Sequence, residues 1–95
     1  MEYILFIHNN TDSETKKEDW GRFFDLALES GLFQGGSVIG NRIQFGGKVV
    51  EDTTKSISGY MRFESESLEP LEQLLAEHPV LKSGGSLELC ELPKS

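Results

Sequence analysis

Two histidines are the side chains in this 95-residue chain best suited to transfer protons near neutral pH. His8 follows an apolar run and is expected to end a strand, where a side chain can reach the mouth of a pocket. Asp12 or Asp52 could orient its ring, which makes His8 the candidate catalytic residue. A solvated residue at the end of a strand is the alternative. His78 precedes Pro79, and we expect it to pack at a helix C-terminus, where the dipole favours a cation.

A second group of side chains has the chemistry of an anion site. Arg42, Tyr60 and Arg62 are candidate ligand-binding residues, because guanidinium groups bind carboxylates through two parallel hydrogen bonds. Glu64 or Glu88 could instead neutralise the arginines across neighbouring strands. The sequence therefore leaves both a ligand site and a structural pairing open.

Aromatic residues supply a third possibility, an apolar ligand pocket. Trp20, Phe23 and Phe24 could form its wall, although their helical spacing also fits the core-facing side of a helix. We keep Trp20 as a candidate ligand-binding residue. Cys90 is the only cysteine and is expected to be a small buried hydrophobe in a strand.

Neither a metal nor a cofactor is expected. A lone cysteine forms no internal disulfide and no zinc site of the Cys-x-x-Cys kind. The glycines form neither a G-x-G-x-x-G run nor a Walker sequence, so no phosphate cradle is predicted.

Composition narrows the class of protein further. Nine basic against sixteen acidic residues give a net charge of -7, the wrong sign for binding a nucleic acid backbone. No apolar run approaches the ~18 residues of a membrane span, and the apolar start lacks the features of a secretory signal. We expect a cytoplasmic protein with a single domain over residues 1–95, bound to neither nucleic acid nor membrane.

The elements that must position these residues follow from hydrophobic periodicity, in the order strand, helix, hairpin, strand, helix, strand. A capping box, Thr15-x-x-Glu18, is predicted to begin the first helix and Gly31 to end it. Ser67 is predicted to cap the second helix and Pro79 to end it. The predicted segments are Glu2–His8, Lys16–Ser30, a hairpin over Arg42–Val50 turning at Gly46-Gly47, Ser58–Glu64, Leu68–Glu77 and Ser86–Leu92.

This order predicts an α+β fold, a ferredoxin-like βαββαβ sheet with an added hairpin and both helices on one face. The first strand is expected to be central and buried on both faces. Met61 and Phe63 are expected under the helices, and Tyr60 and Cys90 on the opposite, open face. Leu87 and Leu89 join the helix side in this scheme, and Arg62, Glu64 and Glu88 join the open face. A second copy of the chain would cover the open face by packing sheet on sheet, which predicts a homodimer.

Several short motifs recur in an order and spacing that span almost the whole chain. They are Gly35-Gly36, Gly46-Gly47-Lys48-Val49-Val50, Thr54-Lys55, Gly59-Tyr60, His78-Pro79-Val80-Leu81 and Gly84-Gly85-Ser86-Leu87-Glu88. In these motifs the chain resembles the YCII-related family, in the branch named for an Asp-Gly-Pro-Phe motif. The resemblance implies a bacterial dimeric α/β barrel made of two ferredoxin-like units.

The chain also departs from that family. The Asp-Gly-Pro-Phe motif is absent, since Val50 is followed by Glu51-Asp52-Thr53-Thr54-Lys55. Enzymes of the wider family have been proposed to use a His–Asp pair with the histidine near the start of the first helix, and this chain has no histidine there. The family's catalytic pair is therefore not carried over.

Two functional classes remain open from the sequence. The first is a small homodimer of unknown function that binds a small molecule or a protein partner on its barrel face. The second is a cofactor-free enzyme that acts on an aromatic or lactone-like compound, with His8 as the proton carrier. A closed cavity holding His8 near a carboxylate would favour the enzyme, and a filled interior would favour the interaction protein.

Overall fold

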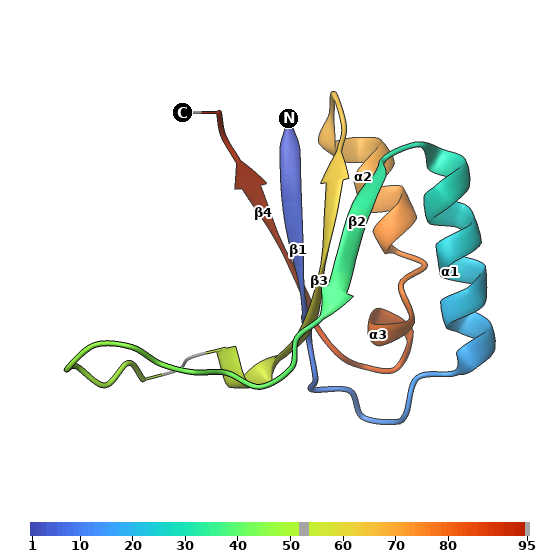
Figure 1. The fold of residues 1–95 in the computed structure, drawn as a ribbon. Helices are drawn as coiled ribbons and strands as arrows, with labels where there is room; N and C mark the ends of the chain where they lie inside the picture. Colours follow the sequence, from blue (N-terminus) through green and yellow to red (C-terminus); the bar gives the residue numbers. More distant parts are fainter. Residues whose placement is uncertain (52–53, 95) are drawn as a thin grey trace.

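The computed structural model describes residues 1–51 and 54–94. In this part of the chain four strands form one antiparallel sheet, and three helices cover one of its faces (Figure 1). The strand order is β2-β3-β1-β4. This is the ferredoxin-like α+β arrangement predicted from the periodicity. The elements are β1 (Glu2–His8), α1 (Lys17–Ser30), β2 (Phe33–Val38), a 3₁₀ turn (Thr54–Ser56), β3 (Ile57–Glu64), α2 (Leu68–Leu75), α3 (Pro79–Lys82) and β4 (Leu87–Leu92).

Strand β1 is central, as predicted, and pairs with β3 on one side and β4 on the other. Its residues Tyr3, Leu5 and Ile7 face the helices and are buried. Ile4 and Phe6 face the other way and are only half-buried. The prediction that β1 is buried on both faces is therefore wrong for the single chain, because its helices cover one face only.

The core fills the space between the sheet and the helices. Leu5, Met61 and Phe63 contribute from the sheet and are at most 3% exposed. Phe23 of α1 and Leu71 of α2 meet them from the helices and are fully buried. This confirms the predicted facing of β3.

Helix α1 begins one residue later than predicted and ends as expected. Gly31 takes a left-handed conformation (φ 72°), which a glycine adopts without steric cost. The predicted capping box is wrong, since no side chain caps this helix. The Thr15 hydroxyl instead accepts a hydrogen bond from Trp20 Nε1 at 2.9 Å. Leu28, which follows Phe24 by about one helical turn, is 68% exposed.

The second predicted helix ends two residues earlier than expected, and a short helix that was not predicted, α3, follows it. Helix α2 ends at Leu75, and Ser67 stands at its N-cap position without a side-chain hydrogen bond. Pro79 does more than end a helix, because it occupies the first turn of α3, where its missing N–H is not needed. His78 is the N-cap of α3, and its Nδ1 accepts the Val80 N–H at 3.1 Å.

Strand β2 contains the Gly35-Gly36 pair in its interior. At Gly36 a Cβ atom would collide with the Tyr60 carbonyl oxygen and lie 2.9 Å from Met61 Cα. The backbones of β2 and β3 can approach this closely only where no side chain intervenes.

The segment between β2 and β3 differs most from the prediction. Residues 40–51, which we call the arm, form no strand and project from the end of the sheet away from the helices (Figure 1). One hydrogen bond crosses the arm, from Gln44 Nε2 to the Lys48 carbonyl at 3.3 Å. The predicted hairpin is therefore absent here, because an isolated pair of short strands has no third strand or helix to stabilise it.

Candidate functional site

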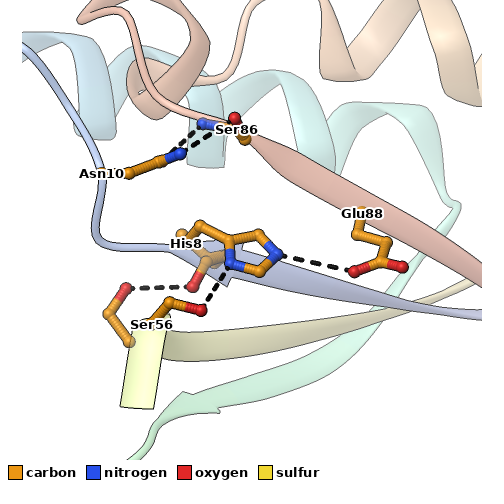
Figure 2. A network of polar contacts seen from close by, with 7 residues as sticks. His8, Asn10, Ser56, Ser86 and Glu88 are labelled. Atoms are coloured by element: carbon orange, nitrogen blue, oxygen red, sulfur yellow. Dashed lines mark hydrogen bonds and ion pairs between the residues drawn. The ribbon is translucent and has the colours of Figure 1, made fainter. Parts of the chain in front are cut away.

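His8 lies at the end of β1, where the pairing with β3 shifts by one residue. Its Nδ1 is 3.0 Å from Ser56 Oγ, and its Nε2 is 3.5 Å from Glu88 Oε1 (Figure 2). The histidine side chain is 22% exposed and the glutamate side chain 65%. His8 is therefore held between a hydroxyl and a carboxylate while remaining open to solvent.

These contacts favour one of the two neutral forms of the ring. A carboxylate beside Nε2 favours the proton on that nitrogen, which leaves Nδ1 to accept the Ser56 hydroxyl proton. Ser56, His8 and Glu88 then form a hydroxyl–imidazole–carboxylate chain, an arrangement suited to proton transfer.

The carboxylate is not the one that sequence reasoning favoured. Asp12 packs against Gly84, and its backbone N–H donates to the Ser83 carbonyl. Asp12 therefore contacts the turn that precedes β4. Asp52 lies outside the described residues. Glu88 could have been found only from the sheet order, because β4 must lie beside β1 before Glu88 can reach the histidine.

Two asparagines hold the chain that follows His8. The Asn9 N–H donates to the Ser56 carbonyl at 2.7 Å. The Asn10 amide oxygen accepts the Ser86 N–H at 2.9 Å, and its Nδ2 donates to the Ser86 hydroxyl at 3.1 Å (Figure 2). The ends of β1 and β4 and the turn before β3 are therefore joined around the histidine.

His8 also lines a cleft of about 590 Å³, which we call the aromatic cleft. The cleft is partly open to solvent in the single chain. Trp20 and Phe24 stack within it, with ring centroids 5.9 Å apart. Its apolar lining comes from α1, β2, β3 and α3: Trp20, Phe24, Phe33, Val38, Met61 and Val80. Its polar lining includes His8, Thr11, Glu14, Thr15, Ser37 and Ser58.

The structure brings together three of the five predicted site residues. His8, Trp20 and Tyr60 all line the aromatic cleft. Arg42 lies at the base of the arm and donates to the carbonyls of Gly40 and Ile57 and to Thr54.

Arg62 lies on the open face of β3 and is exposed. Its Nη2 donates to the Gln34 carbonyl at 3.4 Å. Within residues 1–51 and 54–94, no ion pair joins Arg62 to Glu64 or Glu88. The two arginines therefore do not form one anion site with Tyr60 in the single chain.

His78 supports the cleft from behind. Its ring is fully buried, 5.0 Å from the Trp20 ring and 4.6 Å from the Phe23 ring. Burial lowers the pKa of His78 to about 4, so the ring is neutral at pH 7. The predicted cation at a helix C-terminus is therefore wrong, whereas the predicted packing role fits the burial.

Metal-binding clusters and membrane-spanning helices are both absent from the described part of the chain. Among its residues, no group of three or more His, Cys, Asp or Glu side chains lies close enough to hold a metal ion. None of the helices described above is long and apolar enough to cross a membrane.

A solved structure shares this architecture over the full length of the chain. It is a 5-chloro-2-hydroxyhydroquinone dehydrochlorinase from Burkholderia phenoliruptrix AC1100, in complex with 2,5-dihydroxybenzoquinone. The two chains are 10% identical with a TM-score of 0.56, and the match covers 100% of this chain and 96% of that one. At this identity the likeness shows the fold alone, the ferredoxin-like α+β arrangement described above. No protein-family model matches the chain, and no curated protein matches its sequence.

Proposed function

We propose that this protein is a small cofactor-free enzyme that binds a monocyclic hydroxylated aromatic or quinone-like compound and moves a proton through His8. One observation carries the proposal: His8 is among the residues that border a cleft lined by aromatic side chains, and its ring nitrogen Nε2 is 3.5 Å from the Glu88 carboxylate. The binding of a small molecule is common to both functional classes that the sequence left open. The contact with Glu88 favours the enzyme.

The cleft suits a flat ring compound. Its volume of about 590 Å³ falls in the range of about 300–1,000 Å³ typical of small-molecule sites. The stacked rings of Trp20 and Phe24 offer a face for an aromatic ligand. Ser37 and Ser58 also line the cleft, and their hydroxyl oxygens, which donate to the Val38 and Ile7 carbonyls, can still accept hydrogen bonds from ring hydroxyls. A neighbour of the same fold binds a dihydroxybenzoquinone, which supports this ligand class.

His8 would accept the proton at Nδ1. The Ser56 hydroxyl, which donates to this nitrogen in the resting state, can rotate to accept the new N–H. The ring then carries a positive charge, and Glu88 beside Nε2 stabilises that charge. The reverse transfer returns the proton to another atom of the ligand and restores the neutral ring.

We also propose that the protein is a cytoplasmic homodimer of the YCII-related family. The half-buried apolar residues Ile4 and Phe6 on the open face support the dimer, since a second sheet would remove them from water. The order of motifs in the sequence supports the family.

The experiment follows proton transfer to and from the ring of the ligand, so it does not depend on knowing the complete reaction. Hydroquinone, catechol and 2,5-dihydroxybenzoquinone are titrated into the protein by calorimetry, and exchange of their ring hydrogens in D₂O is followed by NMR. We expect binding by the wild type, and exchange that His8→Gln slows by about 10²–10⁴-fold with little change in affinity. Trp20→Ala should weaken binding.

Two results would contradict parts of the proposal. Binding with no exchange that depends on His8 would show a ligand-binding protein without catalysis. No binding of any of the three compounds would overturn the assignment of the aromatic cleft to this ligand class.

A further inference from the structure

The arm concentrates exposed apolar side chains, and two of them, Phe45 and Val49, are the most exposed large apolar side chains of the described chain. Ile43, Phe45, Val49 and Val50 are 79%, 86%, 88% and 58% exposed. The arm has no regular secondary structure of its own, and the one hydrogen bond that crosses it comes from a glutamine side chain. Such a concentration of apolar surface marks a site of interaction.

Hydrogen bonds hold the base of the arm, although the rest of the arm extends away from the sheet. Arg42 donates to the Gly40 carbonyl at 3.2 Å, to Thr54 Oγ1 at 3.2 Å and to the Ile57 carbonyl. The Ile39 N–H donates to the Ser58 carbonyl at 2.9 Å. These bonds set the direction in which the arm leaves the sheet, away from the helical layer (Figure 1).

The exposed surface area of the chain indicates how large an interface with a partner could be. The single chain exposes 6870 Å², whereas a monomer of 10.6 kDa is expected to expose about 5,500 Å². The excess of roughly 1,400 Å² is larger than the ~800 Å² per partner of a standard interface. The radius of gyration is 14.4 Å, against about 12.4 Å for a compact chain of this length.

We propose that the arm is a clasp that packs on a second copy of this chain. On the open face of the sheet Ile4, Phe6 and Tyr60 are half-buried, so this face is a second apolar surface within the described residues. When two open faces pack about a two-fold axis, an arm that projects away from its own helices extends toward the partner, and the partner's arm does the same. The inference rests on the proposed homodimer and is independent of the proposed catalysis.

The first experiment measures the dimer dissociation constant by sedimentation equilibrium. The arm variant carries Ile43→Ser, Phe45→Ser and Val49→Ser together, and the control carries Leu28→Ser, which removes an exposed apolar side chain from α1. We expect at least a tenfold rise in the dissociation constant for the arm variant and no change for the control. Circular dichroism checks that the sheet and helices persist in both.

The possible outcomes test the clasp and the homodimer as separate proposals. A wild-type dimer whose affinity the arm variant leaves unchanged would overturn the clasp and leave the homodimer standing. A wild type that stays monomeric at every concentration would overturn both.

The second experiment asks where the arm lies. Phe45 is replaced by the photo-crosslinking amino acid p-benzoylphenylalanine, and Leu28 is replaced in the same way as the control. We expect irradiation to give a species of twice 10.6 kDa from position 45 and none from position 28. A crosslink from position 45 that stays within one chain, or no dimeric product at all, would overturn the clasp.

Discussion

His8 and His78 have the same side chain but opposite surroundings. His8 lies at a strand end between Ser56 and Glu88 and remains partly exposed. His78 is enclosed by aromatic rings and keeps one hydrogen bond, from the Val80 N–H. The first arrangement leaves the ring within reach of solvent, as the proposed proton transfer requires, whereas the second keeps a neutral ring in the core.

Acid should therefore destabilise the protein through His78. The folded-state pKa of about 4 lies below the unfolded value of 6.5, so the unfolded chain binds more protons between these values. The stability that the neutral ring provides is complete above pH 6.5 and is lost as the pH falls toward 4. We expect a loss of roughly 2 kcal/mol between pH 7 and pH 5, measured by urea denaturation.

His78→Asn provides the control for that measurement. Asparagine can still accept the Val80 N–H at the N-cap but does not titrate. The variant should be less stable at pH 7 and should lose less stability on acidification than the wild type. An equal pH dependence in both proteins would show that other groups control the acid response.

Phe63 tests the core at the scale of one side chain. It is fully buried and its ring lies 5.7 Å from that of Phe33. Phe63→Ala should lower the free energy of unfolding by about 3–5 kcal/mol, because it leaves a cavity beneath the helices. Chemical denaturation measures the change, and a value near zero would contradict the burial.

At the scale of elements, local periodicity was sufficient for most of the fold. The alternation in Ser58–Glu64 and Ser86–Leu92 predicts β3 and β4 to within one residue, because one face of β3 is buried and Leu87 and Leu89 of β4 pack, partly buried, against the core. The prediction of a hairpin at Arg42–Val50 was wrong for the opposite reason. Its alternating residues pack on nothing within the described chain.

The candidate site was only partly predictable, since its contacts depend on the order of the strands. Helical spacing was enough to select Trp20, and a strand end was enough to select His8. The contact of His8 with Glu88 joins residues eighty positions apart and requires β4 beside β1. The position of Arg42 at the base of the arm was likewise not predictable, because the alternation in Arg42–Val50 indicates a hairpin that the arm does not form.

The close approach of β2 to β3 can be tested at one glycine. Gly36→Ala should destabilise the protein by about 1–3 kcal/mol, because the new methyl group would meet the backbone of β3 at Tyr60 and Met61. Gly47→Ala is the matched control, since a Cβ there meets nothing within 4 Å. Thermal melting compares the two variants, and equal melting temperatures would show that β2 can move away at little cost.

For the whole molecule, net charge opposes assembly. Each copy carries a net charge of -7, so two copies repel one another at low ionic strength. Raising the salt from about 20 mM to about 200 mM shortens the screening length and should tighten the proposed dimer several-fold. Sedimentation equilibrium at both salt concentrations measures this. A weaker dimer at higher salt would show that ion pairs across the interface outweigh the repulsion.

The central place of β1 also has a consequence for the newly made chain. β1 leaves the ribosome before both of its neighbours, and β4 is the last element of the described chain to emerge. During synthesis the apolar run Tyr-Ile-Leu-Phe-Ile therefore has two unpaired edges, the condition under which strands associate with other chains. The acidic surface that opposes dimerisation would then protect the nascent protein, since like charges on neighbouring unfinished chains keep their exposed strands apart.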